Sequence, residues 1–401
     1  PACSLAQSER NALVTFPATF EGFPRACGRP GIRNQLALLS PCGLTTPTTR
    51  KIAALLPQAV VISSPYGRGQ LGADKQFHDQ MFTSFGTHPN IGAAIVLAAD
   101  SKMRRWLQDS VAASGRLAAG FSLQECGEDS EKLVASAVAV GREFLIELAR
   151  AKQACCSVED LILAVECGHS DATSGLAANP LAGELADSLI AAGGAVVIAE
   201  TIEWLGTQDS LYTRCKSPQI AARLKKLFEA RHQLALEAGR DLRIGNPGPQ
   251  NHEGGITTLQ EKSHGAISKG GTSQIAGVLA AGETVPGPGL HLMDTPTLSP
   301  ESISSMVAGG AQLVLFTTGQ GNPYGSAVAP TLKLTANPQT AIRLPHQIDF
   351  DGSDVFVGAR SRQQALPDLS QLMIATCNGM ETAAERLEEC AEVISRLGPS
   401  I

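Results

Sequence analysis

The sequence predicts an α/β protein of two domains, each built on a mainly parallel sheet flanked by helices. Short apolar runs alternate with longer amphipathic stretches over most of the chain. Apolar residues make up 43% of the sequence and aromatic residues only 4%, so small aliphatic side chains must form the helix-on-sheet contacts. The length of 401 residues is too great for one ordinary core and fits two domains.

The elements of the first domain follow from this alternation. Continuous apolar runs such as QLALLS are typical of strands that are buried on both faces. The expected strands are Gln35–Ser40, Ala59–Ser63 and Ile91–Ala98. The expected helices are Thr46–Leu56, Asp74–Gly86, residues 102–112 and Ser130–Lys152. Residues 1–19 are expected to be an irregular lead-in, and residues 20–154 form the first predicted domain.

The second predicted domain, residues 155–401, repeats the pattern and carries most of the site motifs. Its expected strands are Asp160–Glu166, Gly194–Glu200, Leu290–Met293, Ala311–Thr317 and Thr331–Leu334. Helices are expected at Leu181–Ala192 and Ser217–Gly239, and one or two more at Leu372–Leu397. Residues 245–256 are rich in Gly, Pro and Asn and are expected to be a loop.

Bulk properties exclude several function classes. The net charge is −6, and no basic stripe interleaved with aromatic residues is seen, which argues against a nucleic-acid partner. No apolar run reaches the roughly 18 residues that span a bilayer, and the first residues do not resemble a signal peptide. The 10 cysteines form no regular framework, so we expect reduced thiols and a cytoplasmic location.

Chemically capable side chains follow the predicted strand LILAVE. The segment ECGHSD places carboxylate, thiol, imidazole and hydroxyl groups at a strand end, which is where parallel sheets bind ligands. Such a cluster can bind a metal or move protons. The alternative is a turn in which Ser170 or Asp171 caps the next helix.

Three further strand ends or loops carry weaker signals. The glycine-rich stretch before Lys262 can hold an anion with backbone N–H groups, or Glu261 and Lys262 can be a solvated helix face. Asp294, at the end of GLHLMD, can equally be a helix cap. The segment Thr317–Asn322 suits contacts to a carboxylate or to hydroxyl groups, and its alternative is a tight turn.

Taken in order, these segments resemble the altronate/galactarate dehydratase family, including its sulfolactate sulfo-lyase branch. The resemblance rests on GRPGIRN, HPN, ECGHSDATSGLAANP, GNPGPQNHEGGITTLQEKSHGAISKGG, GLHLMDTP and VAGGAQLVLFTTGQGNPYG. It implies a hydro-lyase that dehydrates an aldonate or aldarate to a 2-keto-3-deoxy acid through α-proton abstraction and an enediolate. The alternatives are a carbon-sulfur lyase of the sulfolactate type and a non-catalytic carboxylate-binding subunit.

The resemblance, together with the chemistry of the residues, indicates candidate catalytic and substrate-binding side chains. The catalytic candidates are His169, Lys262 and Asp171. The substrate-binding candidates are Arg68, Asn251, Thr317, Thr318, Gly319 and Gly321. Arg68 stands where the family usually has a thiol and an imidazole, and a guanidinium there is a possible carboxylate clamp.

The family implies one divalent metal, Fe²⁺ in typical members. Several usual thiols are missing near residues 64–70 and 99–101, so Mn²⁺, Mg²⁺ or no metal are alternatives. The candidate metal ligands are Cys167, His169, His252 and Glu261. Single-chain family members have an additional small N-terminal domain, so we expect this chain to be a catalytic subunit, with a possible small partner and a homo-oligomeric assembly.

Overall fold

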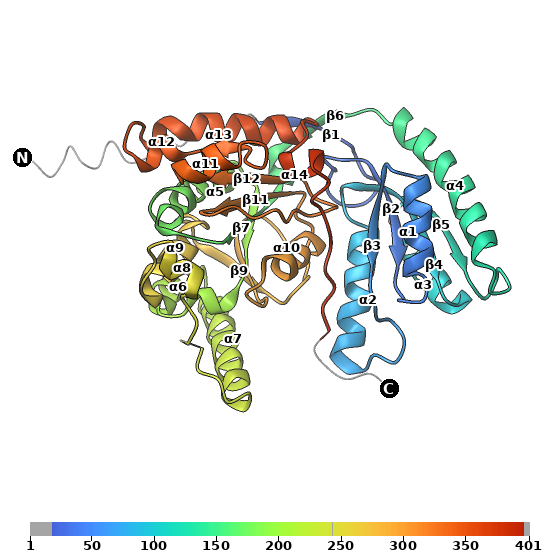
Figure 1. Cartoon of the computed structure of the whole chain (residues 1–401), viewed down its shortest axis with the longest axis horizontal. Helices are drawn as coiled ribbons and strands as arrows, with labels where there is room; N and C mark the ends of the chain where they lie inside the picture. Colours follow the sequence, from blue (N-terminus) through green and yellow to red (C-terminus); the bar gives the residue numbers. More distant parts are fainter. Residues whose placement is uncertain (1–17, 243, 397–401) are drawn as a thin grey trace, which may run out of the picture.

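Two parallel sheets lie side by side in the computed structural model, each covered by helices on both faces (Figure 1). The structure describes residues 18–242 and 244–396. The predicted α/β class is therefore confirmed. Residues 1–17 of the predicted lead-in lie outside the described residues, and β1 (Thr19–Gly22) begins at the last residue of that segment.

The first sheet has four parallel strands in the order β3-β2-β4-β5. The strands are β2 (Gln35–Ser40), β3 (Ala59–Ser63), β4 (Ile91–Ala98) and β5 (Leu117–Ser122). The helices are α1 (Thr46–Leu55), α2 (Gly72–Gly86), α3 (Ser101–Ala113) and α4 (Ser130–Arg150). Helices α1 and α4 pack on one face and α2 and α3 on the other, because successive residues of β2 and β4 point to opposite sides.

The second sheet has seven parallel strands in the order β13-β12-β11-β7-β8-β10-β9. The strands are β7 (Ile162–Gly168), β8 (Ala195–Ile198), β9 (Ile275–Leu279), β10 (Gly289–Met293), β11 (Leu313–Thr318), β12 (Thr331–Thr335) and β13 (Phe350–Asp351). Helices α5 (Asn179–Ala191) and α13 (Arg362–Cys377) cover one face, and α10 (Ser299–Ala308) covers the other.

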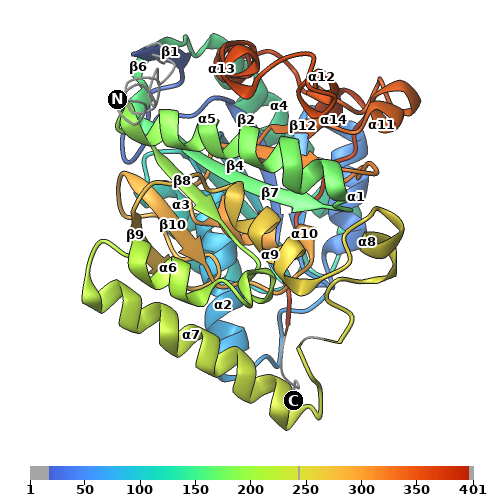
Figure 2. The same cartoon turned by 90° about the vertical axis from the view of Figure 1, so that its left-hand side faces the viewer.

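Shorter and peripheral helices complete this domain. They are α6 (Gln208–Arg214), α7 (Pro218–Glu237), α8 (Pro249–Glu253), α9 (Leu259–Ser268), α11 (Pro338–Arg343), α12 (Ser353–Phe356) and α14 (Ala383–Arg386). Figure 2 shows α7 as a long helix on the outside of the domain, with α8 and α9 at the carboxyl end of β7.

The two sheets share one continuous core. Side chains of α2 pack against α10, so apolar residues of both sheets belong to a single buried cluster. The Asn90 side chain, which precedes β4, donates to the carbonyl oxygens of Gln312 (2.9 Å) and Val328 (3.0 Å). The antiparallel pair of β1 and β6 (Ala154–Ser157) also joins the two parts of the chain. The sheets are therefore fixed relative to each other.

At the end of the chain the predicted one or two helices are present, as α13 and α14, but the predicted limits are wrong. Helix α13 begins ten residues before Leu372, and most of the segment after α14 is not helical. The backbone there is held extended: Gly325 and Cys390 form a β-bridge, and the Glu392 carboxylate accepts hydrogen bonds from the N–H groups of Ala327 and Val328. Tertiary contacts thus override the helical pattern. Leu397 lies outside the described residues.

The chain order creates a crevice at the centre of the second sheet. From β7 the chain proceeds to β8 on one side, and it later returns to β11 on the other side. Ligands of open α/β sheets bind at the carboxyl ends of strands at such a reversal point. The segments that follow β7 and β11 are those that the sequence singled out.

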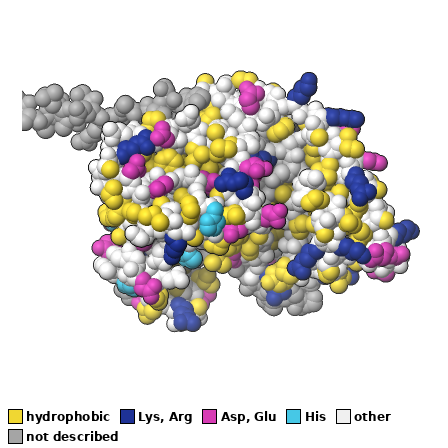
Figure 3. Space-filling model, turned by 45° about the horizontal axis from the view of Figure 1, so that its top comes forward, with side chains coloured by type: hydrophobic (Ala, Val, Ile, Leu, Met, Phe, Trp, Pro, Cys, Tyr) yellow, Lys and Arg dark blue, Asp and Glu magenta, His cyan; other side chains and the backbone are white. Residues whose placement is uncertain are grey.

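The surface carries charges of both signs. On the face shown in Figure 3, Lys and Arg side chains are interspersed with Asp and Glu, and apolar side chains lie between them. Within the described residues, every helix is too short or too polar to cross a membrane.

Candidate active site

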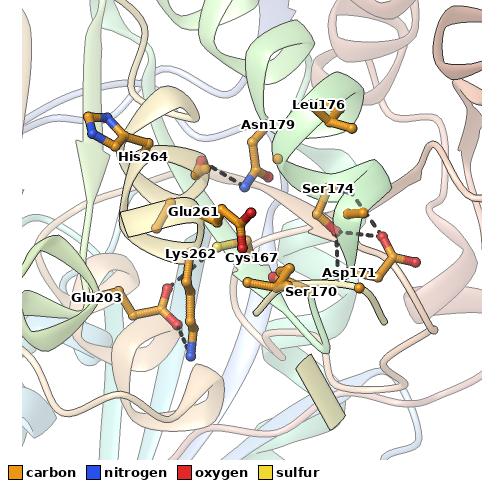
Figure 4. A pocket seen from close by; sticks show the side chains of 16 residues that line it. Cys167, Ser170, Asp171, Ser174, Leu176, Asn179, Glu203, Glu261, Lys262 and His264 are labelled. Atoms are coloured by element: carbon orange, nitrogen blue, oxygen red, sulfur yellow. Dashed lines mark hydrogen bonds and ion pairs between the residues drawn. The ribbon is translucent and has the colours of Figure 1, made fainter. Parts of the chain in front are cut away.

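A cavity of about 370 Å³ opens at the carboxyl end of β7. Its walls come from the loop after β7, the π-helical turn Ser174–Ala178, the short helix Thr201–Trp204 after β8, and the start of α9 (Figure 4). π-Helical turns are uncommon and occur frequently at functional sites. Segments that are distant in sequence therefore converge on one cavity at the position expected for a ligand.

An ion pair lies in the wall of this cavity. The Lys262 Nζ is 3.1 Å from Glu203 Oε1, and Figure 4 shows the two side chains pointing toward each other. Only 16% of the Lys262 side chain and 10% of the Glu203 side chain are exposed. Thr258 caps α9 by accepting from the N–H of Glu261, which fixes the first turn on which Lys262 lies. The pair is thus held at the cavity by local structure.

A second lysine lies behind this pair. Lys269 is fully buried, and its ammonium donates to the Cys167 sulfur at 3.2 Å. The Cys167 thiol in turn lies 3.7 Å from Glu203 Oε2, so the two lysines are linked through Cys167 and Glu203. The carboxyl group of Glu166 is also buried, and neither of its oxygens has a hydrogen-bond partner of good geometry.

Burial and neighbouring charges set opposite protonation tendencies in this cluster. Burial raises the pKa of Glu166 to about 7 and that of Cys167 to about 11. Burial, with the charge of Glu166, raises the pKa of Glu200 well above its usual value. Burial alone would raise the pKa of Glu203, but the two lysine ammonium groups outweigh it and lower that pKa. Glu203 is therefore the carboxyl group of this cluster that favours the ionised form, whereas Glu166 and Glu200 favour the protonated form.

The backbone at Glu200 is strained. Its φ of 74° lies in the left-handed region, which a residue with a long side chain rarely adopts. The N–H of Glu200 donates to Thr295 Oγ1 at 3.0 Å, which holds this conformation. Strained residues of this kind cluster at functional sites, and this one belongs to the buried acidic group.

Asp171, a predicted catalytic residue, lines the cavity, and both oxygens of its carboxylate accept hydrogen bonds from the protein. Its Oδ1 accepts hydrogen bonds from Thr173 Oγ1 (2.6 Å) and from the N–H of Ser174 (3.1 Å), and its Oδ2 accepts one from Asn337 Nδ2 (2.7 Å). A side chain at Gly319 would meet this carboxylate at 2.2 Å. The arrangement orders the surrounding loops around Asp171.

The predicted substrate-binding residues at the end of β11, directly after it and in α8 do not line the cavity. Thr317 is buried and donates to the side-chain oxygen of Asn179, which does line it. Thr318 Oγ1 accepts from the N–H of Gly321 at 3.0 Å, and Asn251 donates to the carbonyl of Ser170 at 2.9 Å. These side chains are thus engaged in shaping the loops around the cavity.

Three other candidates lie apart from the cavity. Arg68 belongs to the carboxyl end of the four-stranded sheet, where its guanidinium donates to Asp100 at 3.0 Å. His169 is exposed, and its Nδ1 donates to the carbonyl of Gly321 at 2.7 Å. His252 is exposed on α8. The structure therefore does not bring Arg68 together with Thr317 and Thr318.

The four predicted metal ligands are also not brought together. Cys167 contacts Lys269, and Glu261 accepts hydrogen bonds from Thr257 and Thr258 of its own helix start. Among residues 18–242 and 244–396, no three His, Cys, Asp or Glu side chains form a group suited to a metal ion. The positive charge among the buried acids is the ammonium of Lys269. The residues present at this cavity do not fit the implied metal.

Sequence reasoning missed several cluster members. Glu203, Lys269 and Glu200 had no predicted role, although Glu200 ends a predicted strand and Lys269 lies in a quoted motif. For Glu200 and Glu203 the available signal was their position after β8, the strand next to β7, whereas Lys269 lies at the end of α9 and had no such signal. Burial distinguishes them from solvated charges, and burial cannot be read from a single charged residue in a sequence.

Two family comparisons account for most of the chain. Residues 158–400 match the family described as D-galactarate/altronate dehydratase, C-terminal, and residues 22–149 match D-galactarate dehydratase/altronate hydrolase, second domain. The chain belongs to this family. The resemblance predicted from the sequence is therefore confirmed.

Curated relatives of this family member are lyases. The β subunit of (2R)-sulfolactate sulfo-lyase from Chromohalobacter salexigens is 33% identical over 382 residues, which cover 94% of this chain and 97% of that protein. Altronate dehydratase from Escherichia coli is 30% identical over 91% of this chain and 75% of its own length. Galactarate dehydratase (L-threo-forming) from Escherichia coli is 28% identical over 62% of this chain and 47% of its own length. The family member described here is thus an enzyme of the lyase class.

Proposed function

We propose that this enzyme removes a group from the carbon next to the hydroxyl-bearing α-carbon of a hydroxy acid, with a 2-keto acid as product. Our first choice is dehydration of an aldonate or aldarate to a 2-keto-3-deoxy acid. The single observation that supports this best is the Lys262–Glu203 pair in the wall of a cavity at the reversal point of the sheet.

The proposed reaction requires a base and a positive charge at fixed positions. The Glu203 carboxylate, whose pKa is lowered despite burial, accepts the α-proton in this proposal. The Lys262 ammonium stabilises the negative charge that develops on the substrate carboxylate. It can also protonate the leaving hydroxyl, so that water departs and the enol product tautomerises to the keto acid. The positive charge of the buried Lys269 also lowers the pKa of Glu203 and so favours its ionised form. His169, a predicted base, is exposed and outside this arrangement.

A second leaving group is favoured by a specific observation. The sulfo-lyase β subunit matches this chain over nearly its whole length, whereas the alignment with altronate dehydratase covers three-quarters of that protein. Expulsion of sulfite from sulfolactate needs the same α-proton abstraction and differs only in the departing group. The β-subunit name also supports a separate small partner subunit. The homo-oligomer, the cytoplasmic location and the metal stay predictions.

The test is a turnover screen with matched variants. Purified protein, with and without added Fe²⁺, Mn²⁺ or Mg²⁺, is incubated with altronate, galactarate and sulfolactate, and 2-keto acid and sulfite are measured. We expect turnover of at least one acid, and a loss of at least about a thousandfold in Lys262→Met and Glu203→Gln. The control is Lys225→Met, at an exposed lysine of α7, which keeps full activity. Full activity of Lys262→Met and Glu203→Gln would refute the proposed roles.

A further inference from the structure

A second cavity, of about 490 Å³, lies on the other side of the Lys262–Glu203 pair. Both side chains line both cavities, so the two cavities adjoin at the ion pair. The remaining lining of the second cavity comes mainly from the segment that follows α7, including Arg240, Asp241 and Asn246. A molecule that contacts the ion pair can therefore extend in two directions.

The charged side chains that line the second cavity are two acids, Glu203 and Asp241, and two bases, Lys262 and Arg240. Glu203 is paired with Lys262 at 3.1 Å, and Asp241 has an interaction of its own. The guanidinium of Arg240 has no hydrogen-bond or ion-pair partner among the described residues. Arg240 is therefore the cationic side chain of this lining whose donors are available to an anionic ligand.

The backbone at Arg240 is fixed although its side chain is exposed. At the end of α7, the N–H of Gly239 donates to the carbonyl of Leu236 at 3.0 Å, and the N–H of Arg240 donates to that of Ala235 at 2.8 Å. Gly239 has a φ of 63°, which favours glycine. This is a Schellman cap, and it gives Arg240 a defined position at the rim of the cavity.

We propose that the second cavity binds the distal end of the substrate and that Arg240 selects acids that carry a second anionic group there. The inference rests on the proposed function, because it assumes that the reacting carbons lie against the Lys262–Glu203 pair. A guanidinium forms paired hydrogen bonds with a carboxylate and equally accepts a sulfonate. A hydroxymethyl group at the distal end of the substrate carries no charge with which the guanidinium could pair.

The test uses probes that the enzyme cannot consume. Adipate and 6-hydroxyhexanoate have the same chain length, lack the α-hydroxyl, and differ only in the charge of the distal group. Calorimetric titration of the full chain should give about tenfold tighter binding of adipate, because a charge-assisted hydrogen bond is gained at a partly exposed site. In Arg240→Met this preference should fall to within about twofold, while 6-hydroxyhexanoate binds as before.

Two further variants and a third probe complete the experiment. Arg240→Lys should retain part of the preference, and Arg142→Met, at an exposed arginine of α4, should retain all of it. Titration of 5-sulfopentanoate, which has the length of adipate and a sulfonate in place of the distal carboxylate, should also show tighter binding than 6-hydroxyhexanoate, and the comparison with adipate shows which anion Arg240 prefers. An adipate preference that is absent in the wild-type protein, or that is unchanged in Arg240→Met, overturns the inference. If Lys262→Met still abolishes turnover in that case, the proposed function stands and only the distal subsite falls.

Discussion

Replacement of Lys269 by methionine tests the electrostatics of the buried cluster. Lys269 is fully buried, and the Cys167 sulfur, Glu166, Glu200 and Glu203 together raise its pKa although burial alone would lower it. Methionine has a similar length and no charge, so the variant leaves buried acids without their counter-ion. Breaking a buried ion pair in this way costs about 3–5 kcal/mol of the free energy of unfolding.

The size of this loss should depend on pH. Glu166 has a pKa of about 7 in the folded protein, raised from 4.5, so its contribution to stability is present at low pH and is lost as pH rises through about 7. Without Lys269 its pKa rises further, because the nearby positive charge is gone. Near pH 5 Glu166 is protonated, burial raises the pKa of Glu200 in the same direction, and the missing ammonium matters less. We expect the full loss at pH 8 and less than half of it at pH 5.

Urea unfolding followed by circular dichroism at pH 5, 6, 7 and 8 measures the effect. Lys333→Met is the matched control, because Lys333 is also buried but donates to the carbonyl of Asn322. Burial lowers the pKa of Lys333 to about 8, so its charge is constant from pH 5 to 7 and its variant should show a flat difference there. An equal loss at pH 5 and pH 8 in Lys269→Met would refute the reasoning.

Two predictions concern loops near the site and the end of the chain. Asp171→Ala should lower the free energy of unfolding by about 2–4 kcal/mol, because the donors of Thr173, Ser174 and Asn337 lose a buried acceptor; an unchanged urea midpoint would contradict this. Burial raises the pKa of Glu392 from 4.5 to about 7, so Glu392 should contribute a fall in stability of up to about 3 kcal/mol as pH rises from 4.5 through 7, in addition to the fall caused by Glu166; in Glu392→Gln, thermal melts should lose this share of the wild-type pH dependence, and an unaltered pH dependence would contradict the contribution of Glu392.

The fold could be predicted largely from continuous apolar runs. The predicted limits of β2, β3 and β4 match the structure because the composition changes abruptly at each end of these apolar runs; β2 and β4 are buried almost throughout, whereas the edge strand β3 is mostly half-buried. β5 was missed because LAAGFS is only partly buried and weakly apolar. The extended segment around Glu392 could not be predicted, since distant backbone groups hold it.

The sequence predicted where the site lies better than it predicted which side chains interact there. Strand-end reasoning indicated the region of Cys167, Asp171 and Lys262, which line the cavity. The alternative that Asp171 caps the next helix agrees with the structure, because its carboxylate accepts from the N–H of Ser174. Strand-end reasoning did not indicate that Lys262 would pair with Glu203, which follows a different strand. A partner across a sheet depends on strand order, and a single sequence does not contain that order explicitly.

The most direct measurement of the central claim is the fate of the proton on the α-carbon. Substrate deuterated at that carbon should react several times more slowly than unlabelled substrate in the wild-type enzyme, because removal of this proton is the step assigned to Glu203 and Lys262. In Glu203→Gln, proton-exchange rates in D₂O, followed by nuclear magnetic resonance, should fall to the rate without enzyme, while the melting temperature stays above the assay temperature. Exchange at the wild-type rate in folded Glu203→Gln and Lys262→Met would contradict the account.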